Sequence, residues 1–475
     1  MTFNSTAFLL FLPVVLAVYW LSNRWTSSHS GLRFQNLLLL VASYVFYGWW
    51  DWRFLGLIAF STAVDYAVGL QMGKHRQRSK AWLAVSILTN IGLLACFKYA
   101  NFFIESWVEA WRVVGFEMNA QTLKFILPVG ISFYTFQTLS YSIDVHRGKL
   151  EPTRDFVAFA AFVSFFPQLV AGPIERAKHL LPQLHFRRKA DAHQITSGVL
   201  LMVWGMFKKI VVADTCGFYA DAILNENQMM PAPVMWTGLV LFSFQIYGDF
   251  SGYSDMAIGI ARLFGIQLST NFKTPYFSRD IAEFWRRWHI SLSTWFRDYV
   301  YFPLGGSRTG KWKVVRNTLV IFLISGFWHG ANWTFVAWGL LHWLYFLPLL
   351  LSHRNRTHVN APFRFHQLPS ILTTFVLVTL AWAFFRADSI SQAVHFLKIS
   401  LDGEMRFPSR LGFIWGEVGF GIALMFLIEG LMQLPWIREK HLNSIGALIV
   451  SLHVLTLYTI SHITGETPAF IYFQF

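Results

Sequence analysis

Long apolar runs separated by short polar stretches dominate the sequence. The run 37–50, for example, contains no charged residue. The runs are close to the twenty residues that a helix needs to cross a bilayer, and they lack the ten-residue alternating segments of a membrane barrel. The pattern therefore predicts an all-α, polytopic membrane protein. The predicted spans lie at about 6–22, 35–50, 54–72, 82–104, 123–145, 196–213, 236–261, 370–385, 412–434 and 445–463.

Two apolar regions do not fit a simple span. Residues 156–172 lie between two basic loops, which favours a re-entrant or interfacial segment. Residues 317–352 are too long for one crossing and predict a hairpin that turns near Asn332. We expect about eleven to twelve spans in one membrane domain. It would consist of N-terminal spans in 1–150, a core in 156–352 and C-terminal spans in 370–475.

Composition and charge support this interpretation. The chain has 475 residues, of which 55% are apolar and only 13% are charged, whereas a soluble domain is about one quarter charged. This excludes a disordered chain and argues against a soluble protein. The net charge of +14 does not require nucleic acid as a partner, because cytoplasmic loops of membrane proteins collect Lys and Arg. The two cysteines, Cys96 and Cys216, are too few for a disulfide framework.

The positions of Lys and Arg also orient the chain. Of the 39 basic residues, 29 lie in one set of alternate loops and 6 in the other set. Basic loops remain on the cytoplasmic side, so we expect the first set in the cytoplasm and both termini outside. The largest cytoplasmic stretch is 262–316.

Within this stretch, residues 279–308 predict an amphipathic helix. Asp280 and Glu283 have the spacing of a helix start, and Pro303 with Gly305 and Gly306 would end the helix. An aromatic stripe with arginines beside it is typical of a helix that lies in the membrane interface. The stripe consists of Phe284, Trp288, Leu292, Trp295 and Tyr299.

Three histidines lie in apolar surroundings. His329 belongs to a segment without Lys, Arg, Asp or Glu between Arg316 and Arg354, and ionisable groups inside spans are costly and often functional. Gly326 and Gly330 beside it would let a ligand or another backbone approach. His289 lies next to the aromatic stripe, and its position alone favours a structural role over a functional one. His342 is interpreted as a core or interface histidine.

Acidic residues near the spans offer a further candidate site. Asp249 and Asp255 lie in the segment 247–255 with hydroxyls and glycines. They could orient a histidine or line a polar channel, and a helix-bending hydrogen-bond network is at least as plausible. The sequence has no G-x-S-x-G elbow, H-E-x-x-H motif or Walker loop. Hydrolase, metalloprotease and ATP-driven pump functions therefore lose their usual support, and we expect no metal.

Six motifs lie in order along the chain, at 171–176, 247–266, 284–308, 328–342, 384–389 and 470–475. Through these motifs the sequence resembles the membrane-bound O-acyltransferase (MBOAT) family, in particular its alginate O-acetyltransferase branch. The resemblance implies a ring of tilted helices around a core with a cytoplasmic cavity, a tunnel and an extracytoplasmic funnel. It also implies that the histidine of the WHG motif, His329, is essential and that His289 of the RWH motif is the second site histidine.

The resemblance implies transfer of an acetyl group from a cytoplasmic thioester, acetyl-CoA, to an extracytoplasmic hydroxyl. Imidazole suits deprotonation of a hydroxyl at neutral pH, so we expect His329 to be the general base. The oxyanion needs hydrogen-bond donors, for which we expect His289, Trp328, Trp288 or Asn332, although His289 could equally orient the donor. Donor phosphates would meet Arg308, Lys311, Lys313 and Arg316, which charge bias alone also explains.

The partners expected on this basis are the lipid bilayer, an acyl-CoA donor and an acceptor outside the bacterial cytoplasmic membrane. The acceptor would be a polysaccharide or a partner protein that completes its O-acetylation, and no cofactor would stay bound. Three alternatives remain open from the sequence. They are a D-alanyl or lipid O-acyltransferase of the same family, a transporter or channel, for which no internal repeat is visible, and a scaffold of a polysaccharide export complex.

Overall fold

The computed structural model describes residues 1–25, 28–118, 127–226, 230–308, 310–359 and 364–433. All regular secondary structure in these ranges is helical, which confirms the all-α prediction. The predicted span 445–463 and the C-terminal motif 470–475 lie outside the described residues.

Six helical segments of the described chain are long and apolar enough to cross a membrane. They confirm the predicted spans 35–50, 54–72, 82–104, 196–213, 370–385 and 412–434. The predicted spans 123–145 and 236–261 are not among the six, and Thr6–Ser22 is a shorter apolar helix. The segment Ser30–Lys74 contains two predicted spans, which a short 3-10 turn at Trp52–Phe54 separates. The six are Ser30–Lys74, Arg76–Val113, Ala192–Leu224, Trp333–Leu351, Leu368–Arg386 and Arg410–Leu431.

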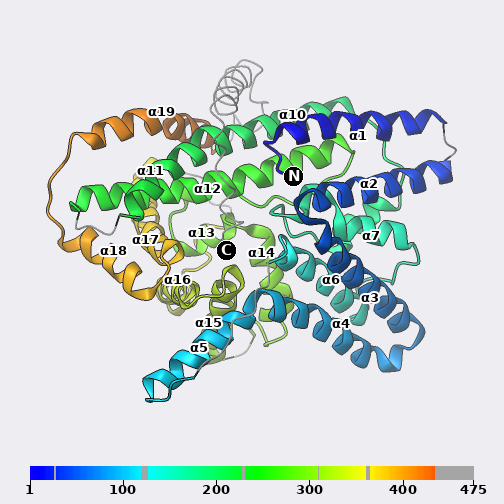
Figure 1. Cartoon of the computed structure of the whole chain (residues 1–475), viewed down its shortest axis with the longest axis horizontal. Coiled ribbons are helices and arrows are strands. Elements are labelled where there is room, and N and C mark those ends of the chain that lie inside the picture. Colours follow the sequence, from blue (N-terminus) through cyan, green and yellow to red (C-terminus); the bar gives the residue numbers. More distant parts are fainter. Residues whose placement is uncertain (26–27, 119–126, 227–229, 309, 360–363, 434–475) are drawn as a thin grey trace. The chain divides into compact units, whose positions relative to one another are not determined.

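The described chain forms two compact units. The first contains Met1–Val199 and Ala257–Ser269. In it, α3 (Leu55–Lys74) packs against both α4 (Ser79–Leu94) and α6 (Ile131–His146) (Figure 1). The segment 156–172 forms two short buried helices separated at Phe165, so it is not a continuous span. The helices of this unit include α1 (Thr6–Trp25), α2 (Ser28–Asp51), α3 (Leu55–Lys74), α4 (Ser79–Leu94), α5 (Ala100–Val113), α6 (Ile131–His146), α7 (Phe156–Ser164), α8 (Phe166–Leu169) and α9 (Ala177–Leu180).

A buried carboxyl group joins three helices of this first unit. Asp65 of α3 accepts hydrogen bonds from Ser86 Oγ at 2.5 Å and Asn90 Nδ2 at 2.7 Å, both on α4. Ser142 Oγ of α6 donates to it at 2.8 Å. All four side chains are buried. The amide oxygen of Asn90 is satisfied as well, by the hydroxyl of Thr138.

The second unit contains Leu200–Met256 and the described part of Thr270–Phe475. Its apolar core is built mainly from aromatic and branched side chains, which include Trp288, Trp338 and Trp382. Its helices are the end of α10 (Ala192–Phe207), α11 (Thr215–Leu224), most of α12 (Ala232–Leu263), α13 (Ile281–Arg287), α14 (Ile290–Phe296), α15 (Lys311–His329), α16 (Trp333–Leu351), α17 (Leu368–Arg386), α18 (Ile390–Asp402) and α19 (Arg410–Leu431).

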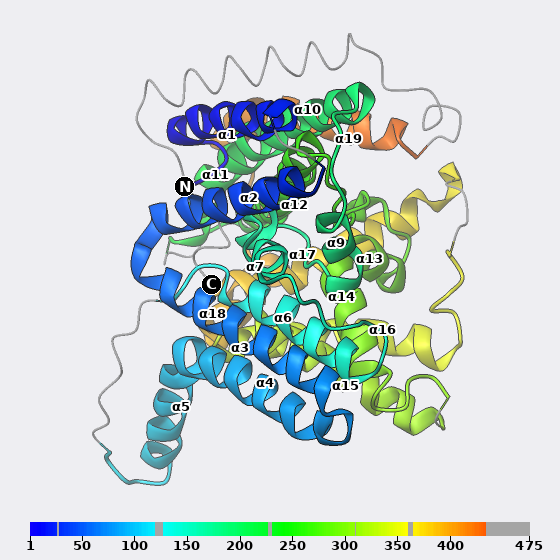
Figure 2. The same cartoon turned by 90° about the vertical axis from the view of Figure 1, so that its right-hand side faces the viewer.

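The predicted hairpin is present as α15 and α16, which pack against each other (Figure 2). It turns at Asn332, whose side chain accepts a hydrogen bond from the Thr334 backbone and so caps α16. Glycines let the two helices approach closely. A side chain at Gly326 would collide with the Phe335 carbonyl, and one at Gly339 would collide with the Phe322 carbonyl. Gly326 therefore serves backbone packing.

The predicted interfacial helix over 279–308 is wrong. Its start is confirmed, because Asp280 caps α13 by accepting from the Glu283 backbone. The helix then ends at Arg287, and α14 begins at Ile290, with His289 in the left-handed region at φ +43°. Trp288 and Leu292 lie in the protein interior. The aromatic stripe is therefore the core-facing side of two short helices.

Candidate active site

Two buried histidines come together in the second unit. His289 lies between α13 and α14, and His329 is the last residue of α15. Their ring centroids are 6.3 Å apart, and their exposed fractions are 0% and 4%. Trp328 contacts both rings, at 6.0 Å from His289 and 4.9 Å from His329. The pairing of these histidines, 40 positions apart in the sequence, defines the candidate active site.

Asn271 determines the tautomer of His289. The Nδ1 atom of His289 lies 3.1 Å from the amide oxygen of Asn271. This oxygen also accepts the backbone N–H of Ser291, while the Asn271 amide nitrogen donates to Ser254 Oγ, so the orientation of the amide is fixed. His289 Nδ1 therefore carries the proton in the neutral ring, and Nε2 carries a lone pair.

The Nε2 atom of His289 is buried and has no hydrogen-bond partner among the described residues. Burial lowers the pKa of His289 from 6.5 to about 3, because the charged ring would be poorly solvated. The ring is thus neutral at physiological pH. In that state it is a hydrogen-bond acceptor at Nε2 and cannot donate to an oxyanion there.

His329 lies in an aromatic enclosure at the hairpin turn. Its ring is 5.2 Å from Trp338 and 5.4 Å from Phe385, centroid to centroid. The next residue, Gly330, has no space for a side chain, because a Cβ there would collide with the Phe335 ring. The glycine therefore allows this ring to close over the end of α15. Closely packed rings exclude water, which strengthens electrostatic interactions at the histidine.

The structure distinguishes between the expected oxyanion donors. Asn332 is engaged elsewhere, since its amide nitrogen donates to the Asp388 carbonyl at 2.9 Å and its oxygen caps α16. Trp288 packs among Phe272, Phe284 and Trp382 in the core. These contacts give Asn332 and Trp288 structural roles. Trp328 remains the indole that lies beside both histidines.

Asp249 and Asp255 form ion pairs with lysines that the sequence interpretation missed. Lys208 contacts Asp255 at 2.5 Å, and Lys209 contacts Asp249 at 2.7 Å and Asp214 at 2.6 Å. Both lysines are at least 95% buried. They begin a π-helical segment, Lys208–Asp214, between α10 and α11. The sequence did contain a signal for these ion pairs. Two adjacent lysines lie in one apolar segment, and two acids lie in the next.

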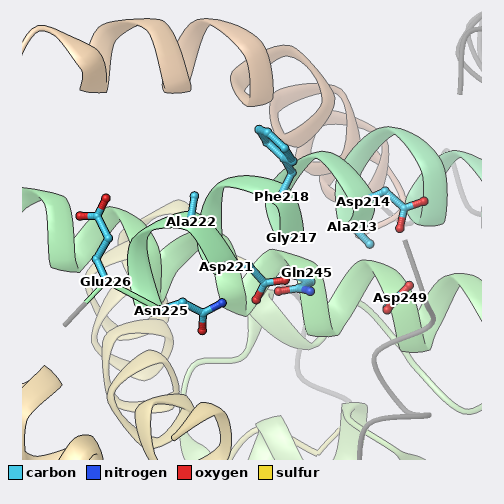
Figure 3. A pocket seen from close by; sticks show the side chains of 10 residues that line it. All are labelled: Ala213, Asp214, Gly217, Phe218, Asp221, Ala222, Asn225, Glu226, Gln245 and Asp249. Carbon is cyan, nitrogen blue, oxygen red and sulfur yellow. The ribbon is translucent and has the colours of Figure 1, made fainter. Parts of the chain in front are cut away.

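A cavity of about 640 Å³ opens beside these ion pairs (Figure 3). Its side chains come from α12, from α11 and the two residues that follow it, and from the end of the π-helical segment. The polar residues that line it are Asp214, Asp221, Asn225, Glu226, Gln245 and Asp249. Asp249 is followed by Phe250, whose ring contacts His289 at 4.7 Å. One helix, α12, therefore contributes both to the cavity and to the packing of the histidine site.

The four basic residues expected at the donor phosphates lie at the other end of α15. Arg308, Lys311, Lys313 and Arg316 are all exposed. They follow a tight turn at Gly305 and Gly306, where φ is +103° and +57°. A helix rises 1.5 Å per residue, so Lys311 and His329 are separated by about 27 Å along α15. These cations are not in the histidine site. Within the described ranges, no three His, Cys, Asp or Glu side chains gather as a metal site would require.

Sequence comparison identifies proteins similar to this chain. Residues 15–386 match the model of the membrane-bound O-acyltransferase family. The probable alginate O-acetylase AlgI of Pseudomonas aeruginosa is 42% identical over 398 residues, which cover 83% of this chain and 73% of that protein.

Two further relatives broaden the comparison. The peptidoglycan O-acetyltransferase of Helicobacter pylori is 36% identical over 437 residues, which cover 84% of this chain and 80% of that protein. A teichoic acid D-alanyltransferase of Streptococcus thermophilus is 32% identical over 231 residues, which cover only 45% of this chain. The similarity to the O-acetylating relatives thus extends over much more of the chain than the similarity to the D-alanylating one.

Proposed function

This chain belongs to the membrane-bound O-acyltransferase family, and we propose that it transfers an acetyl group from acetyl-CoA to a hydroxyl on the opposite side of the membrane. It is a multi-pass membrane protein and an O-acyltransferase. The acetyl donor, the extracytoplasmic acceptor and the bacterial cytoplasmic membrane are parts of the proposal.

The observation that carries the proposal is the buried pair of His289 and His329. Acyl transfer to an alcohol needs a base within reach of the hydroxyl and an environment that excludes competing water. His289 remains neutral and weakly basic because of its burial, so it is better suited to accepting a hydrogen bond than to removing a proton. We therefore assign His329 as the general base and His289 as the acceptor that orients a substrate O–H or N–H.

The reaction follows from these assignments. The hydroxyl oxygen attacks the thioester carbonyl carbon while His329 takes the hydroxyl proton. A tetrahedral oxyanion forms, and an N–H donor in the enclosure stabilises it. The indole of Trp328, which contacts both histidine rings, is our candidate for this donor. The C–S bond then breaks, and the proton held by His329 protonates the departing thiolate.

The charge distribution assigns the two substrates to opposite sides. The basic stretch 262–316 indicates the cytoplasmic side, where an acyl-CoA would bind. The stretch 214–235 contains no Lys or Arg but includes three acids, which indicates the other side. The cavity beside Asp214 and Asp221 belongs to that stretch. We propose that the acceptor, a polysaccharide hydroxyl or a hydroxyl of a partner protein, approaches from there.

Transfer of radiolabelled acetyl from acetyl-CoA by the purified full-length protein tests the proposal. Alginate, peptidoglycan fragments and a neutral glycan serve as acceptors, with a folded His329→Ala variant as the matched control. We expect label in an acceptor only with the unchanged protein. Failure to consume acetyl-CoA with every acceptor would overturn the acetyl-donor assignment.

Two other donors separate the related activities. A D-alanyl carrier protein tests the activity named for the Streptococcus relative, and a long-chain acyl-CoA tests lipid acylation. Transfer from either donor at a higher rate than from acetyl-CoA would replace the proposed reaction by that one. The partial coverage by the D-alanyltransferase favours the acetyl donor.

A further inference from the structure

His342 is a buried histidine that the proposed reaction does not use. It lies in the middle of α16, and its exposed fraction is 0%. Among the described residues, neither of its ring nitrogens has a hydrogen-bond partner. Most buried polar groups in proteins are paired, and an unpaired one destabilises the fold. Packing alone would therefore favour phenylalanine at this position.

Aromatic rings surround His342 and connect it to the histidine site. Its ring stacks on Phe284 at an interplanar angle of 6° and contacts Trp285 at 5.0 Å. It also contacts Trp338 at 4.9 Å, and Trp338 in turn contacts His329 at 5.2 Å. A single indole therefore separates His342 from the proposed general base.

Two indole N–H groups next to His342 also lack hydrogen-bond partners among the described residues. The indole N–H groups of Trp285 and Trp338 are buried and have no acceptor in the described part of the chain. A neutral imidazole offers one donor and one acceptor. Together these groups complement a ligand with several carbonyl oxygens and at least one N–H, which is the pattern of an amide.

His342 also lies at an intermediate position along the hairpin. Gly339 meets Phe322 across the antiparallel helices, and His342 is three residues further from the turn. It is therefore displaced from His329 toward the end of α15 that carries the exposed Lys311 and Lys313. A linear donor with phosphates at one end and a thioester at the other would pass His342 between these two ends.

We infer that His342, together with the Trp285 N–H, binds an amide in the arm of the acyl donor and so positions the thioester at His329. The inference rests on the proposed function, because it assumes a donor of the acyl-CoA class, whose arm carries amides between its phosphates and its sulfur. His342 is a positioning residue and takes no part in bond making or breaking.

A donor without an amide provides the test. Acetyl-CoA and ethyl thioacetate carry the same acetyl thioester, but the second lacks the arm. Thiol release in the presence of an acceptor is measured for the full-length protein and for His342→Phe with both donors. We expect kcat/KM for acetyl-CoA to fall roughly tenfold or more, as for the loss of a buried hydrogen bond. For ethyl thioacetate we expect less than a twofold change.

Protein stability gives an independent readout. Phenylalanine removes two unpaired buried nitrogens, so the melting temperature of His342→Phe should equal or exceed that of the unchanged protein. Trp285→Phe keeps a ring but removes the N–H, and it should reproduce the donor-dependent loss. It also decides the question if His342→Phe does not fold. The exposed His395 of α18 provides the control His395→Phe, which should leave both donors unaffected.

Equal losses with both donors would overturn the inference, because His342 would then act on the reacting centre or on the fold. Unchanged kinetics with acetyl-CoA would overturn it as well. If the unchanged protein releases no thiol from acetyl-CoA, the proposed function is overturned. The inference about His342, which rests on that function, is then overturned as well. If it does release thiol and the variants show no dependence on the donor, only the inference fails.

Discussion

The two compact units each contain a buried polar cluster, and the clusters differ in how completely their hydrogen bonds are satisfied. In the first unit, Asp65 receives donors from Ser86, Asn90 and Ser142 on two neighbouring helices. In the second unit, His289 uses Nδ1 but has Nε2 unpaired among the described residues, and His342 has both nitrogens unpaired there.

This difference separates structural from functional polarity in an apolar interior. A network in which every donor meets an acceptor holds helices together and needs nothing further. A buried group without a partner costs stability, and its presence is understandable if a substrate supplies the missing partner. Both clusters would look alike in a list of polar residues within apolar runs. We expect substitutions in the satisfied cluster around Asp65 to reduce mainly stability, and substitutions in the cluster of His289, His329 and His342 to reduce mainly activity.

The largest effect is expected for His329→Ala. Removal of a general base typically costs 10² to 10⁴ in rate, so we expect kcat for acetyl transfer to fall about 10³-fold, equivalent to roughly 4 kcal/mol. The labelled acetyl-CoA assay measures this directly. Melting in detergent should show a folded protein. A variant that keeps more than a tenth of the activity would remove the catalytic assignment.

Asp65→Leu should reduce stability and leave kcat unchanged, which is the opposite of the result expected for His329→Ala. It leaves three buried donors without an acceptor, and each such group costs about 1–3 kcal/mol. We expect a stability loss of about 3 kcal/mol, measured by reversible unfolding in mixed micelles. The kcat per folded molecule should stay within twofold. Asp65→Asn is the matched control, since it retains one carbonyl oxygen and should lose less stability. A large fall in kcat for either folded variant would break the comparison.

Asn271→Leu tests whether the tautomer of His289 matters. Without the amide oxygen, Nδ1 loses its acceptor and Nε2 is no longer fixed as the lone-pair atom. We expect kcat to fall about 10- to 100-fold, comparable to the loss of an orienting second partner. Asn271→Asp keeps an oxygen opposite Nδ1 and should recover much of the rate. Equal activity of the two variants would show that Asn271 acts only through packing.

Most of the helices and one of the two site histidines could be predicted from the sequence. The apolar runs predicted the helices, and the uncharged segment before Arg354 singled out His329 as a costly and therefore informative residue. The hairpin turn at Asn332 was predicted because the apolar run 317–352 is too long for a single crossing. The break at His289 was not predictable, because the aromatic stripe continues at helical spacing through it. Only the left-handed backbone at His289 separates the two helices.

Contacts between residues that are far apart in the sequence could not be predicted. Asn271 lies 18 residues before His289, in a loop with no recognisable motif, yet it determines which nitrogen of His289 carries the proton. Lys208 and Lys209 were counted as residues inside a span, and their pairing with Asp255 and Asp249 requires two helices to be placed side by side. Helical periodicity predicts which face of a helix is apolar, but it does not identify the partner across that face.

The smallest effect is expected for the exposed cations at the start of α15. The double variant Lys311→Ala with Lys313→Ala removes two charges that are far from His329 along the helix. Exposed charge pairs contribute about 0–1 kcal/mol each, so we expect KM for acetyl-CoA to rise about 3- to 5-fold without a change in kcat. High salt screens such interactions, and it should reduce the difference between variant and unchanged protein.

The matched control for this variant is Lys74→Ala with Lys80→Ala, which removes the same charge from exposed lysines of another basic loop, 73–81. It should leave KM unchanged, because Lys74 and Lys80 lie outside the proposed donor site. General attraction between a basic surface and an anionic donor would instead act through both pairs alike. An equal rise in KM for the two double variants would assign the effect to net charge. A rise in KM confined to the Lys311 and Lys313 variant would indicate that the donor site extends from His329 past His342 to these two surface lysines. They would then bind the phosphates of the donor.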